Sequence, residues 1–175
     1  MKALKQFTIP FSGLKLGKHQ FELEIDKDFF DAYEYSLVKD GTLKANLELD
    51  KQETMLILNF DIQGSIQLSC DTCLADFAQP VNIKEKQIVK FADDELTNED
   101  LEIMVISRKD SEIEVADLIY EYITISVPYV NNCEQAGVTC DPEMLQTLQK
   151  FSARDTEQTE ESKEDPRWAA LKKLK

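Results

Sequence analysis

Four cysteines are the residues of this chain whose type and spacing best suit a chemical site. Cys70 and Cys73 have two residues between them, whereas Cys133 and Cys140 have six. A two-residue spacing lets both sulfurs reach one tetrahedral ion, and a distant second pair can complete the ligand set. The spacing therefore favours a structural zinc site with Cys70, Cys73, Cys133 and Cys140 as its ligands.

Two other interpretations of the cysteines stay open. Cys70 follows Ile66 and Leu68 at a period of two, so it can be a small buried hydrophobe with a free thiol at the end of a strand. Cys70 and Cys73 can instead form a redox pair, which requires a lowered thiol pKa. The carboxylate of Asp71, between them, works against such a pKa.

The remaining side chains do not suggest an enzyme. His19 is the single histidine, in a Gly-Lys-His-Gln context typical of a surface turn, and any catalytic triad would depend on it. The five glycines are scattered and form no phosphate-binding loop. The sequence therefore favours a non-enzymatic binding protein without a small-molecule substrate.

Length and hydropathy indicate a cytoplasmic protein. The chain has 175 residues, enough for one domain with a tail. No apolar run approaches the roughly 18 residues of a membrane span, and the first residues lack the apolar segment of a secretory signal. We expect no membrane contact, and a cytoplasmic setting disfavours stable disulfides.

The net charge of −14 is unevenly distributed. Residues 93–121 carry eleven acidic and two basic side chains, whereas both ends of the chain are basic. Acidic surfaces repel phosphate, so any RNA contact must use the basic ends or a shielded patch. At the C-terminal end, Trp168 and Arg167 can also stack on unpaired bases. The candidate RNA- or partner-binding residues are Lys2, Lys5, Lys15, Lys18, Arg167, Trp168, Lys172, Lys173 and Lys175. The acidic middle suits a basic protein partner or serves as solvated surface.

Alternating apolar residues predict a β-rich body. The alternation covers 21–25, 43–49 and 56–62, with a hairpin over 42–62, and continues through 66–70, 81–91 and 101–106. Gly64 interrupts the pattern, as expected for a bulge or bend. We predict an α+β fold, with a mainly antiparallel sheet or partial β-barrel and a few packed helices.

Helical signals separate the strands and end the chain. Short helices are expected over 26–35 and after Pro142, and an amphipathic helix runs from 115 to Pro128. Residues 1–151 would form a single β-rich domain, 152–165 an acidic linker, and 166–175 a short basic amphipathic helix. A helix of that length is unstable alone in water, so it would dock on its own domain or on a partner.

The order of several of these motifs along the chain resembles that of a known protein family. Cys-x-x-Cys-Leu at 70–74 follows a β-rich half and precedes an acidic stretch, a segment over 117–128 that ends in Val-Pro, Cys133 and a terminal DPRWAALKKLK. This order resembles the YceD family of large ribosomal RNA subunit accumulation proteins over most of the chain. The resemblance implies a bacterial cytoplasmic protein needed for normal build-up of that RNA, without a known enzymatic reaction. Cys70, Cys73 and Cys133 match family positions, and Cys140 is an addition.

Two functional hypotheses follow. In the first, which the resemblance favours, the protein supports accumulation of large-subunit rRNA and assembly of the large ribosomal subunit by binding rRNA or a basic ribosomal protein. In the second, it is a thiol-based redox or metal-handling protein that uses Cys70 and Cys73.

Overall fold

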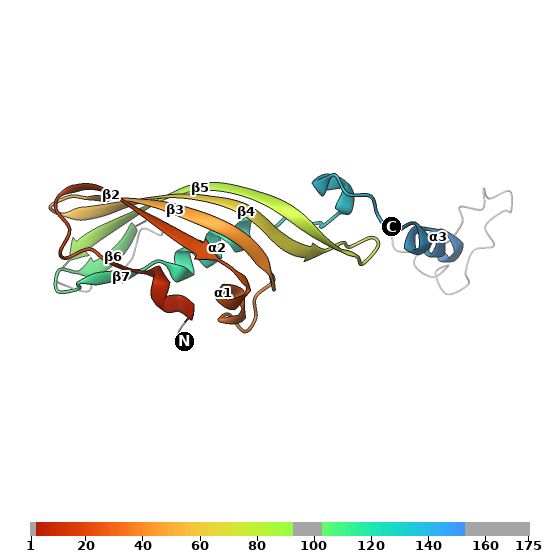
Figure 1. Ribbon diagram of the computed structural model, residues 1–175, viewed down its shortest axis with the longest axis horizontal. Helices are drawn as coiled ribbons and strands as arrows, with labels where there is room; N and C mark the ends of the chain where they lie inside the picture. Colours follow the sequence, from red (N-terminus) through yellow and green to blue (C-terminus); the bar gives the residue numbers. More distant parts are fainter. Residues whose placement is uncertain (1–2, 93–102, 153–175) are drawn as a thin grey trace, which may run out of the picture. The chain divides into compact units, whose positions relative to one another are not determined.

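A curved sheet of five strands forms the body of the chain in the computed structural model, which describes residues 3–92 and 103–152. The strands are β1 (Thr8–Pro10), β2 (Gly17–Ile25), β3 (Gly41–Lys51), β4 (Met55–Ser69), β5 (Asp76–Ala92), β6 (Ile103–Ser107) and β7 (Glu112–Glu114). The helices are η1 (Ala3–Phe7), α1 (Lys27–Asp31), α2 (Ala116–Ser126), η2 (Cys133–Ala136) and α3 (Pro142–Phe151). The sheet order is β2-β3-β4-β5-β6, and β1 pairs with β7 separately (Figure 1).

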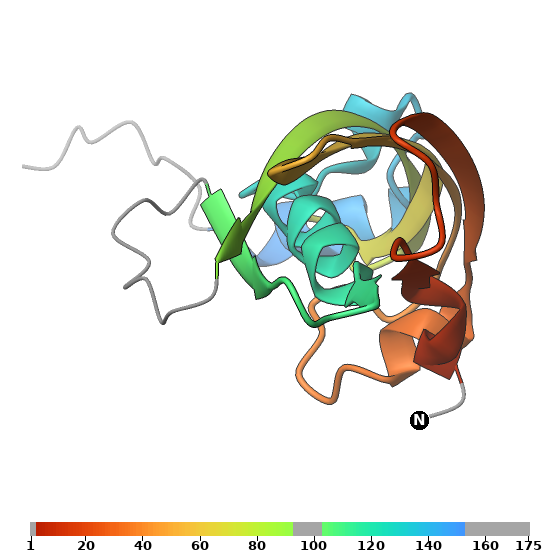
Figure 2. The same cartoon turned by 90° about the vertical axis from the view of Figure 1, so that its left-hand side faces the viewer.

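The predicted alternation sets the two faces of the sheet. Ala45 on β3 lies opposite Leu23 on β2 and Ile62 on β4, and all three side chains are buried on the concave face. Helix α2 lies within the curve of the sheet (Figure 2) and buries Ile119 and Ile123. The predicted α+β fold with a mainly antiparallel sheet is therefore confirmed, and this sheet is not a closed barrel.

The three predicted helices that fall within the described residues are present, with different lengths. Asp26 caps α1 by accepting a hydrogen bond from the Phe29 backbone N–H at 3.3 Å, but α1 ends at Asp31. Its two phenylalanines are buried, and the Phe29 ring centroid lies 4.8 Å from that of Phe7. Helix α2 ends at Ser126, just before Pro128, as its sequence pattern predicts.

Gly64 does not form the expected bulge. Strand β4 runs through it without a break in register, and Gly64 lies opposite Leu43 on β3 and Val81 on β5. Its φ of 151° falls in the region that favours glycine, and the backbone of β3 approaches it closely. His19 is likewise part of β2, opposite Leu49, and not of a turn.

Two strand pairings arise from long-range contacts. Strand β5 is a single long strand, and β6 runs parallel to it, with Ile103 opposite Ile88. The pair β1–β7 places Ile9 opposite Ile113, directly before α2, and buries both side chains. This small sheet therefore anchors the N-terminal segment to the start of α2.

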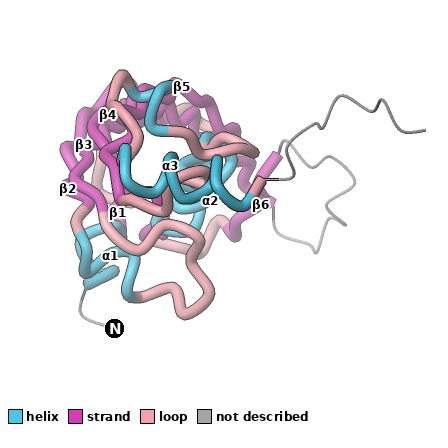
Figure 3. Tube along the Cα trace, turned by 90° about the vertical axis from the view of Figure 1, so that its right-hand side faces the viewer, coloured by secondary structure: helices cyan, strands magenta, loops and turns pink. Residues whose placement is uncertain are grey.

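The chain divides into two compact units, Met1–Cys140 and Asp141–Lys175. The first contains the sheet, whose strands β2 to β5 lie side by side (magenta in Figure 3). In the second, Asp141 caps α3 by accepting from the Glu143 backbone N–H at 2.9 Å. Apart from Ser152, the predicted acidic linker and the terminal helix lie outside the described residues, and the domain over 1–151 stays a prediction. Within the described residues, no helix has the length and apolar character needed to cross a membrane.

Candidate metal centre

Two turns position three of the four cysteines, and Cys140 lies in the segment between η2 and α3. Cys70 and Cys73 lie in the turn between β4 and β5, where the Cys70 backbone N–H donates to the Ala75 carbonyl and the Leu74 N–H donates to the Cys70 carbonyl, both at 2.9 Å. Cys133 opens η2, and the Val138 N–H donates to its carbonyl at 2.9 Å. Local backbone hydrogen bonds therefore fix each turn.

A reciprocal link joins the two turns. The Asp71 backbone N–H donates to the Asn131 carbonyl at 2.8 Å, and the Asn131 N–H donates to the Asp71 carboxylate at 2.7 Å. In the sequence Asp71 stands out only as an unfavourable charge beside the cysteines. Since its partner lies sixty positions away, no local pattern predicts this positioning role.

The four sulfurs converge in the arrangement that the spacing predicts. All four lie within 4.8 Å of one another, with Cys70 Sγ 3.9 Å from Cys140 Sγ and Cys73 Sγ 3.7 Å from Cys133 Sγ. Tetrahedral zinc with Zn–S bonds of about 2.3 Å places its sulfurs about 3.8 Å apart, whereas a disulfide bond measures about 2.05 Å. The cysteines are free thiols at distances that suit four ligands of one zinc ion.

The electrostatics of the site also suit a cation. Backbone N–H groups of Cys73 and Cys133 donate to the Cys70 sulfur and lower the pKa of Cys70 to about 6. Burial raises the pKa of Cys133 to about 12 and that of Cys140 to about 11. Four clustered thiolates are thus unfavourable alone, and a divalent ion would offset their charge.

The burial of the cysteines distinguishes this cluster from a reactive redox pair. Cys70, Cys73 and Cys133 are buried, and only Cys140 among the four is partly exposed. The lowered pKa of Cys70 meets one requirement of a redox thiol, despite the neighbouring carboxylate of Asp71. Reactive cysteines are also partly exposed, whereas Cys70 and Cys73 are both buried. The arrangement favours a structural site.

Leu74 occupies the position where a glycine would fit the cysteine turn better. Its φ of 61° is left-handed, which costs a residue with a Cβ about 1–2 kcal/mol. The side chain is 69% exposed, so little burial is lost on its removal. We expect Leu74→Gly to raise the free energy of unfolding by about 0.5–1 kcal/mol in denaturant titration, net of the added freedom of the unfolded chain. Leu74→Ala keeps the Cβ, and an equal gain there would contradict this explanation.

The candidate RNA- or partner-binding residues are only partly described. Lys5, Lys15 and Lys18 are exposed. Lys18 Nζ donates to Glu48 Oε1 at 2.9 Å, and this bond raises the pKa of Lys18. Lys2 and the C-terminal candidates, Arg167, Trp168, Lys172, Lys173 and Lys175, lie outside the described residues.

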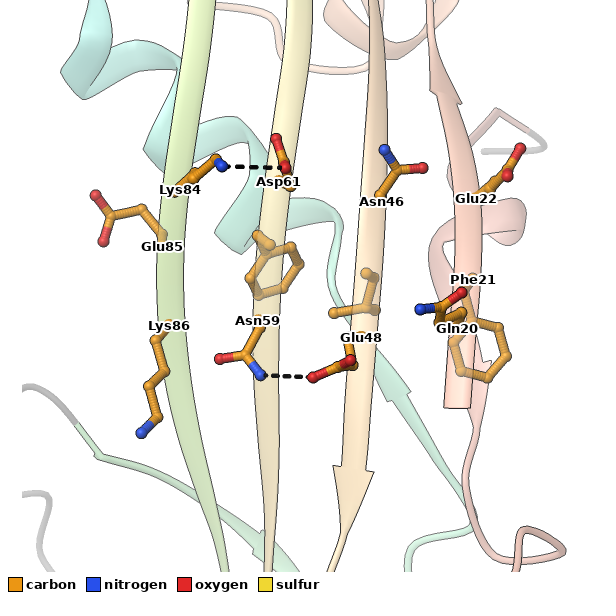
Figure 4. Close-up of a pocket in the computed structure, with 12 residues that line it drawn as sticks. Gln20, Phe21, Glu22, Asn46, Glu48, Asn59, Asp61, Lys84, Glu85 and Lys86 are labelled. Carbon is orange, nitrogen blue, oxygen red and sulfur yellow. Dashed lines mark hydrogen bonds and ion pairs between the residues drawn. The ribbon is translucent and has the colours of Figure 1, made fainter. Parts of the chain in front are cut away.

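A groove of about 970 Å³ crosses the convex face of the sheet (Figure 4). Side chains from four strands form rows across it, and Lys84 pairs with Asp61 at 3.7 Å. Asn59 donates to Glu48 at 3.4 Å within the next row. Of the two aromatic residues that line the groove, Phe60 is buried and packs against Tyr122 of α2, and Phe21 is half-buried, so neither offers an open platform for unpaired bases. Paired cations and carboxylates, such as Lys84 and Asp61, partly neutralise one another there. We interpret this groove as a solvated face.

Comparison with known proteins identifies the family. The family model described as large ribosomal RNA subunit accumulation protein YceD matches residues 58–175. The match includes all four cysteines and covers more than half of the chain. Neither the curated proteins nor the solved structures contain a match. The chain therefore belongs to the YceD family of large ribosomal RNA subunit accumulation proteins.

Proposed function

We propose that this protein is a non-enzymatic factor that supports accumulation of large-subunit rRNA and assembly of the large ribosomal subunit in the cytoplasm. The family match over residues 58–175 is the observation that carries this proposal. The protein acts by binding rRNA or a basic ribosomal protein, and the acidic composition supports attraction to basic partners.

Depletion of the protein tests this function. We expect the ratio of large-subunit to small-subunit rRNA to fall when the gene is silenced, with free small subunits in excess on a sucrose gradient. Restored expression of the wild-type chain should recover the ratio. An unchanged ratio during complete depletion would reject the proposed function.

A structural zinc ion at the cysteine cluster forms the second part of the proposal. Cys70, Cys73, Cys133 and Cys140 would hold the ion, which would supply a cross-link between the β4–β5 turn and the segment after α2. The convergence of four sulfurs within 4.8 Å supports this assignment. The predicted redox alternative requires accessible thiols, and the burial of Cys70 and Cys73 favours the structural role.

A further inference from the structure

A cleft of about 680 Å³ lies directly beside the cysteine cluster. Its walls come from the segment between α1 and β3, the end of β4, the start of β5 and the link between Asp71 and Asn131. Three carboxylates line it, from Asp40, Asp71 and Asp76, together with one cation, Lys39, so the lining keeps a net negative charge. Lys39 Nζ donates to the Glu34 backbone carbonyl at 3.4 Å. The β4–β5 turn that carries Cys70 and Cys73 therefore also forms part of this cleft.

The three carboxylates are exposed but held in place. Asp40 Oδ1 accepts from the Gly41 backbone N–H at 2.8 Å, Asp71 Oδ2 accepts from the Asn131 N–H, and Asp76 Oδ1 accepts from the Ser69 hydroxyl. None of them takes part in an ion pair found among the described residues. This separates the cleft from the convex groove, where Lys84 and Lys18 already pair with acidic side chains.

One further feature of the cleft shows what a partner must supply. Leu37 also lines the cleft and keeps 73% of its surface exposed. A partner that supplies positive charge and an aliphatic surface would complement both the three carboxylates and Leu37.

We propose that this cleft docks a lysine- or arginine-bearing segment of a basic protein. The cationic groups of that segment donate to Asp40, Asp71 and Asp76, and its aliphatic carbons cover Leu37. RNA is disfavoured here because its phosphates are acceptors that meet carboxylates of the same sign. The inference rests on the proposed function and assigns a basic protein, not rRNA, to this surface.

An NMR titration tests the site with a defined probe. The full-length ¹⁵N-labelled protein is titrated with a synthetic peptide that contains alternating lysine and leucine. We expect amide shifts to concentrate at Leu37, Asp40, Asp71 and Asp76. Absence of shifts, or shifts spread over the convex face, would overturn the proposal.

Charge-matched variants separate local recognition from general attraction. Asp40→Asn with Asp76→Asn removes two carboxylates from the cleft and keeps their shape, and we expect peptide binding about tenfold weaker at low salt. Glu24→Gln with Glu53→Gln makes the same charge change at exposed positions, on β2 and in the β3–β4 turn, where we expect less than a twofold effect. Equal weakening in both double variants would overturn the proposal.

A single-stranded RNA oligonucleotide provides the competing arm of the test. We expect it to leave the amide shifts at the cleft unchanged, and the same shifts with RNA would overturn the choice of a protein partner. If the peptide does not bind at the cleft but depletion still lowers the ratio of large-subunit to small-subunit rRNA, only the docking site is rejected. A normal rRNA ratio on depletion would reject the function itself.

Discussion

Replacement of Cys133 by alanine is expected to abolish stoichiometric zinc binding and to lower the free energy of unfolding by about 4 kcal/mol or more. Binding of structural zinc to four thiolates supplies about 10–16 kcal/mol of apparent free energy, which is comparable with the whole stability of a domain. Cys133 is buried and its sulfur lies 3.7 Å from that of Cys73, so the substitution leaves three thiolates and an open position in the ligand set. Metal analysis and thermal unfolding of the purified variant measure both effects.

A chelator provides the control for this prediction. It should lower the unfolding temperature of the wild-type protein toward that of Cys133→Ala and leave the variant unchanged, because both treatments remove the same cross-link. If the cysteines are only buried free thiols, the chelator will have no effect on the wild-type protein. That result, together with a loss of only about 1 kcal/mol in the variant, would contradict the zinc assignment.

The second large effect is expected at Gly64, where alanine should destabilise the sheet by about 3–5 kcal/mol. An added Cβ would lie 2.6 Å from the Leu43 Cα and also overlap the Thr42 carbonyl oxygen. Both contacts are with the β3 backbone, which cannot move without disturbing its pairing with β2, and the φ of 151° adds strain. Urea titration monitored by circular dichroism would measure the loss.

Gly17→Ala is the matched control for Gly64→Ala. Gly17 also has a left-handed φ, of 114°, but an added Cβ would meet no atom within 4 Å. We expect this change to lower the free energy of unfolding by about 1–2 kcal/mol, which measures the cost of backbone strain alone. Similar losses at both glycines would show that close approach of β3 is not the cause.

The strands and the cysteine cluster follow from the sequence to different extents. The alternation of Leu43 to Leu49 predicts β3, because one face of an antiparallel strand is buried and the other is solvated. The parallel pairing of β5 with β6 carries no comparable local signal. At Gly64 the sequence pattern indicates an irregularity, but only the neighbouring backbone of β3 explains why glycine is required.

In the candidate sites too, local sequence patterns predict some features, whereas contacts between distant segments are seen only in the structure. Two-residue spacing predicts the contribution of Cys70 and Cys73, and the convergence of Cys133 and Cys140 on them agrees with the predicted ligand set. The link between Asp71 and Asn131, and the cleft beside it, depend on segments that are distant in sequence and meet only in the fold. From the sequence, Asp71 is only a negative charge beside the cysteines, and its contact with Asn131 cannot be predicted.

Sedimentation of cell extract containing the tagged full-length protein is the most direct test of the proposed role in large-subunit assembly. RNA and proteins that copurify with the tag would be identified in each fraction. We predict that the protein sediments with precursors of the large subunit and copurifies with large-subunit rRNA and its basic proteins. Sedimentation only as free protein, with no enrichment of large-subunit components, would contradict the proposed function.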